Sequence, residues 1–158
     1  MSAGAAKQTT SVEGTERLGA AFGPVLRAGD VVTLSGPLGA GKTRFVTGLA
    51  RAIAPGSRVR SPSFTLVNEI PGTPWLFHLD LYRLERERDI EGLGLEEYAE
   101  RGALVVEWGE RLPSSWRADA LELSITAGDG DVRVVSARAH GTRGAELLAA
   151  WCALPEAW

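Results

Sequence analysis

The sequence predicts a three-layer α/β domain, with helices on both faces of a central sheet. Short apolar stretches typical of buried strands alternate along the chain with segments whose apolar residues recur at helical spacing. A glycine-rich segment, SGPLGAGKT at 35–43, joins the first such stretch to the helix expected after it. The chain has 158 residues, which suits one domain with its own core.

The first half of the chain is expected to supply a helix, a strand and a second helix. Residues 1–11 are small and polar and are predicted to be disordered, which leaves 12–158 as the folded domain. Apolar residues recur at helical spacing over 13–26. The apolar run VVTLS at 31–35 is typical of a buried parallel strand, and a helix is expected to follow from about 41 to 54.

The rest of the chain is expected to form two hairpins, one further strand and two helical segments. A turn at 71–74 (PGTP) joins the strands of the first hairpin, and a turn at 128–130 (GDG) joins those of the second, C-terminal hairpin. Glycines divide the charged helical segment that precedes the lone strand. The strands are 64–69, 75–81, 103–108, 120–127 and 132–139, and the helical segments are 85–101 and 144–154.

The composition is that of an ordinary globular domain, with 44% hydrophobic and 23% charged residues. A net charge of −3 argues against a broad nucleic-acid-binding face. Cys152 is the single cysteine, so no intramolecular disulfide can form, which fits a reducing cytoplasm. No apolar run has the length of a membrane span, and the first residues lack the order of a signal peptide. We therefore expect a cytoplasmic protein with no membrane partner.

The segment 36–43 follows the pattern G-x-x-x-x-G-K-[ST] of phosphate-binding loops, or P-loops. Its glycines let the backbone curl so that N–H groups point at phosphate oxygens, and the helix that starts there adds the positive end of its dipole. Lys42 would reach the outer phosphates, and Thr43 offers a hydroxyl to Mg²⁺. A glycine-rich turn without a ligand is the alternative, but the strand before it and the helix after it favour phosphate binding. The residues expected around the nucleotide here are Gly36, Leu38, Gly39, Ala40, Gly41, Lys42, Thr43 and Arg44.

The scarcity of lysine helps to identify the nucleotide. Lys7 and Lys42 are the only two lysines of the chain. GTPases usually read guanine with a short Asn-Lys-x-Asp segment, which requires a second lysine beyond the P-loop. Lys7 lies before the loop and is followed by Gln8 and Thr9, so this segment is absent. The sequence therefore predicts ATP, with Mg²⁺, as the ligand.

Two acidic residues near the ends of predicted strands are candidates for holding the metal and ordering water. Asp80 lies in FHLDLYRL, and Glu107 lies in the apolar run ALVVEW. P-loop enzymes use acids at strand ends for this purpose. A turn residue at Asp80 and a surface ion pair at Glu107 are the alternatives. The P-loop beside them favours the functional interpretation of both.

The stretch RSPSFTLVNEI at 60–70 carries three hydroxyls, on Ser61, Ser63 and Thr65. In P-loop switch proteins a loop in this place can sense the terminal phosphate. A polar loop that merely leads into a strand is equally compatible with the residues, so both interpretations stay open.

Five segments, taken together and in order, resemble the TsaE family, the ATPase component of the bacterial machinery that makes threonylcarbamoyladenosine in tRNA. They are GPLGAGKT (36–43), SPSFTLVNE (61–69), FHLDLYRL (77–84), LGLEEY (93–98) and VVEWGERL (105–112). The P-loop alone is generic, whereas the other four segments are specific. The resemblance covers most of the chain and implies a P-loop NTPase fold with a mixed, mostly parallel central sheet. It also implies that Thr15 and Arg133 approach the nucleotide.

The resemblance further implies a slow, partner-regulated ATPase that acts with the TsaD and TsaB subunits. Those two subunits transfer the threonylcarbamoyl group to adenosine. The TsaE-like protein uses ATP to reset the complex between rounds and meets tRNA only indirectly, through the complex. Matched by position, Lys42, Asp80 and Glu107 would be catalytic, and Thr43 and Glu107 would hold Mg²⁺.

Two other functions stay open on the sequence. A small-molecule kinase could use the same P-loop with a mobile arginine-bearing lid, for which Arg83, Arg86 and Arg88 are candidates. The acidic residues interleaved among these arginines indicate a solvated helix instead. A nucleotide-gated binding module, in which hydrolysis is incidental, is the third possibility.

Overall fold

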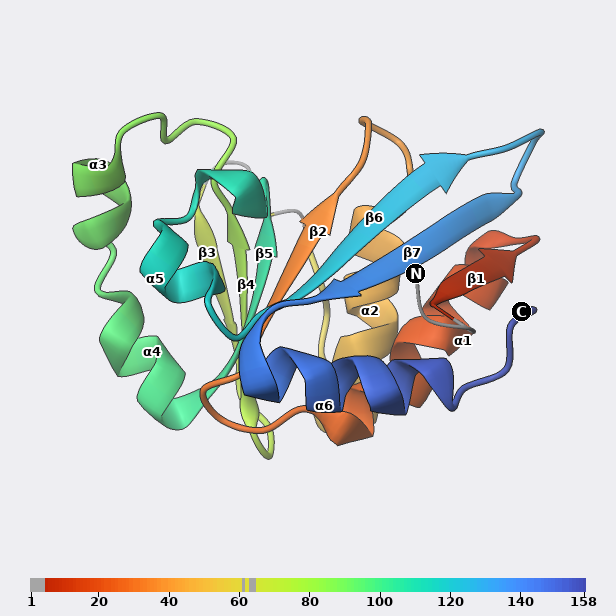
Figure 1. Ribbon diagram of the computed structural model, residues 1–158, viewed down its shortest axis with the longest axis horizontal. Coiled ribbons are helices and arrows are strands. Elements are labelled where there is room, and N and C mark those ends of the chain that lie inside the picture. The colour runs from red at the N-terminus through yellow and green to blue at the C-terminus, as the bar shows by residue number, and fades with distance from the viewer. Residues whose placement is uncertain (1–4, 61, 63–64) are drawn as a thin grey trace.

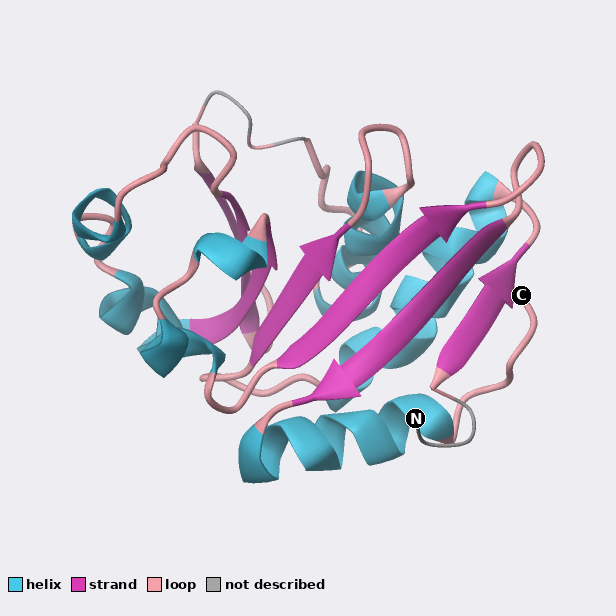
Figure 2. Ribbon diagram, turned by 45° about the horizontal axis from the view of Figure 1, so that its top comes forward, coloured by secondary structure: helices cyan, strands magenta, loops and turns pink. Residues whose placement is uncertain are grey.

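The computed structural model describes residues 5–60, 62 and 65–158, which form a seven-stranded sheet with helices on both faces (Figures 1 and 2). The strands are β1 (Ala6–Thr9), β2 (Val31–Ser35), β3 (Val67–Ile70), β4 (Trp75–Asp80), β5 (Gly102–Glu107), β6 (Leu121–Ala127) and β7 (Arg133–Ala139). The α-helices are α1 (Val12–Phe22), α2 (Lys42–Ile53), α3 (Glu87–Glu91), α4 (Leu95–Arg101), α5 (Ser114–Arg117) and α6 (Gly141–Cys152). Short 3-10 helices occupy Gly23–Val25 and Gly109–Arg111. None of the helices in these ranges combines the length and the apolar character that crossing a membrane requires.

The strand order is β1-β7-β6-β2-β5-β4-β3. The four central strands, β6, β2, β5 and β4, run parallel, and antiparallel strands flank them on both sides. The prediction of an α/β fold with a mixed, mostly parallel central sheet and a C-terminal antiparallel hairpin is confirmed. The carboxyl ends of parallel strands meet at one edge, which is where open α/β sheets bind ligands.

The sheet separates two apolar cores. On one face α1, α2 and α6 pack together, and the rings of Phe22 and Trp151 meet edge to face with centroids 5.4 Å apart. On the other face Ile90 of α3 and Leu95 of α4 cover the sheet. Strand β5 is buried along its whole length, which fits the apolar run from Ala103 to Val106 that precedes Glu107.

The predicted disorder of residues 1–11 is wrong for Ala6–Thr9, which form β1 at the edge of the sheet. This strand pairs antiparallel with β7, and Lys7 is fully buried, with its Nζ 2.6 Å from the Leu154 carbonyl oxygen. The segment AKQT lacks an apolar pattern, so the strand was not predicted. Its order comes from pairing with β7, a strand more than a hundred residues away. Residues 1–4 lie outside the described part of the chain.

Glycines bring α1 and α2 unusually close together. A Cβ atom on Gly48 would lie 1.9 Å from the Glu16 carbonyl oxygen, and one on Gly19 would lie 2.2 Å from the Phe45 carbonyl oxygen. The close crossing sets the start of α1 beside the start of α2. The Thr15 methyl group consequently lies 3.7 Å from the position that a Cβ on Gly41 would take.

We expect Gly48→Ala to lower the free energy of unfolding by about 2 kcal/mol, in the range typical of overpacked cores. The added methyl group would meet backbone atoms, and this cost exceeds the gain of roughly 1 kcal/mol in helix propensity. Gly92→Ala is the matched control, because Gly92 has a right-handed φ of −65° and its nearest neighbours lie at 3.5 Å. Urea unfolding of both variants tests this, and equal stability of the two would contradict the packing argument.

Candidate functional site

The glycine-rich loop between β2 and α2 has a backbone shape that favours glycine at three places, because Gly36, Gly39 and Gly41 all have positive φ. Gly36 has φ 149°, and a Cβ there would lie 2.5 Å from the Ile125 carbonyl oxygen. Gly41 has φ 104° and forms the N-cap of α2 in the left-handed conformation. Among the described residues no side chain caps α2, so the first N–H groups of this helix are available to an anion.

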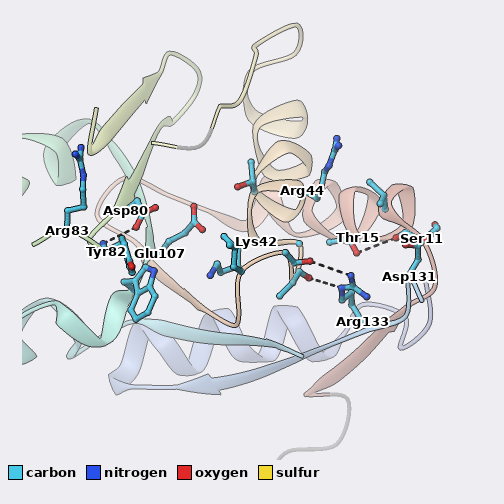
Figure 3. Close-up of a pocket in the computed structure, with 17 residues that line it drawn as sticks. Ser11, Thr15, Lys42, Arg44, Asp80, Tyr82, Arg83, Glu107, Asp131 and Arg133 are labelled. Atoms are coloured by element: carbon cyan, nitrogen blue, oxygen red, sulfur yellow. Dashed lines mark hydrogen bonds between the residues drawn. The ribbon is translucent and has the colours of Figure 1, made fainter. Parts of the chain in front are cut away.

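A cleft of about 690 Å³ opens over this loop, a size usual for small-molecule sites (Figure 3). Its walls come from the start of α1, the glycine loop, the ends of β4 and β5, and the turn between β6 and β7. Figure 3 shows Asp80 and Glu107 at one end of the cleft and Thr15 and Arg133 at the other, with Lys42 between them. The predicted site residues that line it are Thr15, Leu38, Gly39, Ala40, Gly41, Lys42, Thr43, Arg44, Asp80, Glu107 and Arg133. Gly36 does not line the cleft but shapes the loop beneath it.

The ammonium group of Lys42 folds back over the loop from which it comes. Its Nζ lies 2.6 Å from the Gly36 carbonyl oxygen and 6.0 Å from the centroid of the Trp108 ring. The positive charge therefore lies within the cleft, between the loop and the strand-end acids.

The two candidate acids end neighbouring parallel strands. Asp80 of β4 is the register partner of Glu107 of β5, and both are largely buried. The Asp80 carboxylate accepts a hydrogen bond from the Tyr82 N–H at 3.0 Å. An oxygen of the Glu107 carboxylate lies 2.7 Å from Nε2 of His78, a fully buried side chain of β4.

The donor set of the cleft suits Mg²⁺. This ion prefers oxygen ligands and is usually bound by one or two carboxylates together with substrate phosphates. Thr43 offers a hydroxyl, and Glu107 and Asp80 offer carboxylates, on the same cleft. Among the residues that the structure describes, no group of three or more His, Cys, Asp or Glu side chains could hold a metal ion.

Arg133 braces the glycine loop from the far side of the cleft. Its Nε donates to the Ala40 carbonyl oxygen at 3.0 Å, and a terminal nitrogen donates to that of Gly39 at 3.4 Å. The other terminal nitrogen donates to the Gly130 and Val132 carbonyl oxygens, both at 2.8 Å. The guanidinium group thus ties the loop to the β6–β7 turn, a contact that the sequence does not reveal.

An aromatic cluster of Tyr82 and Trp108 lies at the acid end of the cleft and was not among the predicted site residues. Trp108 has a left-handed φ of 60°, and its ring centroid lies 5.2 Å from that of Tyr82. The Arg111 guanidinium lies 4.9 Å from the Trp108 centroid and donates to the carbonyl oxygens of Leu81 and Tyr82. Tyr82 follows Asp80 in the segment FHLDLYRL, so its position beside the site was open to prediction, whereas the Arg111 contacts were not.

The switch-like stretch is described only in part. Ser61 and Ser63 lie outside the described residues. Thr65 is exposed, does not line the cleft, and has its hydroxyl oxygen 3.2 Å from the Asn68 side-chain oxygen. The next residue, Leu66, has φ 67° and accepts a hydrogen bond from the Asp80 N–H at 3.0 Å. The stretch is therefore joined to the acid end of the cleft through the backbone.

Comparisons with known proteins agree with this architecture. The family model described as threonylcarbamoyl adenosine biosynthesis protein TsaE matches residues 9–135. A protein of a Nostoc species named tRNA threonylcarbamoyladenosine biosynthesis protein TsaE is 37% identical over 150 residues, which cover 91% of this chain and 85% of that protein. The protein of the same name from Bacillus subtilis is 36% identical, with 86% of each chain covered. A crystal structure of Bacillus subtilis YdiB superimposes with a TM-score of 0.76 at 32% identity and covers 92% of both chains. Because the family model covers the glycine loop, both acid-bearing strands and most of the C-terminal hairpin, the chain belongs to the TsaE family.

Proposed function

We propose that this chain is the ATP-binding and ATP-hydrolysing component of the machinery that makes threonylcarbamoyladenosine in tRNA. The observation that carries this proposal is one cleft in which an uncapped helix N-terminus and Lys42 face two strand-end carboxylates, Asp80 and Glu107. The family to which the chain belongs is described by its role in threonylcarbamoyladenosine biosynthesis, which supplies the biological setting.

The residues at the loop end bind the triphosphate. The N–H groups at the start of α2 donate to phosphate oxygens, and the helix dipole favours their negative charge. Lys42 leaves the Gly36 carbonyl oxygen and neutralises the outer phosphates. Arg133 keeps the carbonyl groups of Gly39 and Ala40 turned toward itself, so that the loop stays open to the ligand.

The residues at the acid end hold the metal and the attacking water. Thr43 and Glu107 would bind Mg²⁺, which would neutralise charge that develops on the terminal phosphate. Asp80, fixed by the Tyr82 N–H, accepts a hydrogen bond from water and orients it. Both acids are largely buried, which strengthens their electrostatic effect.

The proposed partners are the TsaD and TsaB subunits in the cytoplasm, with tRNA met only through that complex. A net charge of −3 suits a protein partner better than bare nucleic acid. In this role ATP turnover is slow alone and resets the complex between rounds of transfer. A binding module with incidental hydrolysis would show turnover that TsaB and TsaD leave unchanged.

A small-molecule kinase is the alternative that one observation favours. Arg83 lines the cleft, as an arginine of a closing lid would, whereas Arg86 and Arg88 do not line it. Transfer of phosphate from ATP to an added small acceptor, rather than to water, would support this alternative.

Lys42→Ala should lower ATP turnover by about 10²–10³-fold, because removing one preorganised charge from the phosphates has an effect of this order. Turnover is measured as released phosphate at saturating ATP, and circular dichroism checks the fold. Arg58→Ala is the control, since it removes one exposed positive charge that does not line the cleft. Unchanged turnover in folded Lys42→Ala would refute phosphate binding by the loop.

Glu107→Gln should raise the Mg²⁺ concentration needed for half-maximal turnover about tenfold or more, because an amide is a weaker ligand for this ion than a carboxylate. Glu110→Gln makes the same change three residues later, on an exposed side chain that does not line the cleft, and should have little effect. Titration of turnover against Mg²⁺ compares the two. Equal Mg²⁺ requirements would remove the metal role from Glu107.

Thr65→Val should reduce the difference in affinity that a TsaB–TsaD complex shows between the ATP-analogue and ADP states. The valine keeps the shape of the side chain but loses the contact with Asn68 that orders the stretch leading to Leu66 and Asp80. Binding of the partner complex is titrated in both nucleotide states, with Thr142→Val on α6 as the control. If the wild type binds its partners equally well in both states, the stretch is no switch and the regulatory mechanism fails.

A further inference from the structure

A histidine of β4 is buried in a place where packing calls for an apolar side chain. His78 is fully buried, between Leu76 and Asp80 on the same face of the strand. Its Nε2 lies 2.7 Å from an oxygen of Glu107, and its Nδ1 has no hydrogen-bond partner among the described residues. An imidazole with one unpaired nitrogen costs more to bury than a leucine would. Its presence therefore requires an explanation beyond packing.

The direction of the hydrogen bond follows from the chemistry of the pair. An ionised carboxylate only accepts hydrogen bonds, so Nε2 of His78 carries a hydrogen and donates a hydrogen bond to Glu107. Nδ1 is then the ring nitrogen that has no partner among the described residues. Among the residues that the structure describes, His78 is the only side chain that hydrogen-bonds the Glu107 carboxylate.

We propose that His78 is a positioning residue that holds one carboxylate oxygen of Glu107 and thereby presents the other to Mg²⁺ in the cleft. The inference rests on the proposed function, in which Glu107 binds that ion. A glutamate has three rotatable side-chain bonds. Glu107 is the last residue of β5, and its side chain lines an open cleft. A donor on the neighbouring strand restricts these rotations before the metal arrives. Partners of this kind, one step behind a metal ligand, typically contribute 10- to 100-fold to metal affinity.

Three variants separate positioning from packing. His78→Leu fills the space but removes the donor, and His78→Gln carries an amide N–H near the place of Nε2. His78→Asn carries the same amide group on a side chain one carbon shorter, which does not reach Glu107. Mn²⁺ serves as the probe, and electron paramagnetic resonance measures its binding to the full chain in the presence of ADP. ADP affinity in EDTA is measured alongside.

His78→Leu should weaken Mn²⁺ binding about 10- to 100-fold. Its ADP affinity without metal should stay within about twofold of wild type, because the substitution leaves the P-loop untouched. His78→Gln should recover Mn²⁺ affinity to within about threefold of wild type, and His78→Asn should not. In a Glu107→Gln background, His78→Leu should cause no further loss, since the group that it positions has already been changed.

Wild-type Mn²⁺ affinity in His78→Leu overturns the inference. So does an equal loss in the glutamine and asparagine variants, a comparison that carries the test if His78→Leu does not fold. If His78→Leu lowers Mn²⁺ affinity as much in the Glu107→Gln background as in the wild type, His78 acts through packing, and the inference is also overturned. If the wild type itself shows no nucleotide-dependent Mn²⁺ binding, the metal role in the proposed function fails, and the positioning role fails with it.

Discussion

The candidate site depends on the parallel register of β2, β5 and β4. Leu34 pairs with Glu107, and Glu107 pairs with Asp80, so both carboxylates end at the edge where β2 runs into the glycine loop. Parallel strands require a crossover between them, and α2 supplies the first one. Its N-terminus therefore faces the same edge as the acids. A shift of one residue between β4 and β5 would turn Asp80 to the opposite face.

The close crossing of α1 and α2 completes the other end of the cleft. Because Gly19 and Gly48 have no side chains, the backbones of the two helices come into direct contact, and this brings Thr15 next to Gly41. The hydroxyl oxygen of Thr15 lies 2.8 Å from that of Thr9 in β1, the edge strand. The nucleotide cleft is consequently supported by the edge of the sheet, although its chemistry lies at the centre.

Local pattern was sufficient to predict the elements that the site needs most. The apolar run 31–35, the glycine loop and the helix after it occur where the sequence indicated, because each is specified by neighbouring residues. The elements that escaped prediction depend on distant partners. The polar segment Ala6–Thr9 becomes a strand only through β7, and Arg133 reaches Ala40 only because the fold brings them together. The sequence around His78 gave no indication of its role, because its partner, Glu107, lies on the neighbouring strand.

The two ends of the cleft are held by different parts of the chain. At the loop end, Arg133 links Ala40 to the β6–β7 turn. At the acid end, the Asp80 N–H donates to the carbonyl oxygen of Leu66. Leu66 has φ 67°, a region that leucine rarely adopts, so surrounding contacts must hold this backbone in place. The stretch before β3 is therefore bonded to the acid end of the cleft, whereas the glycine loop is bonded to the β6–β7 turn.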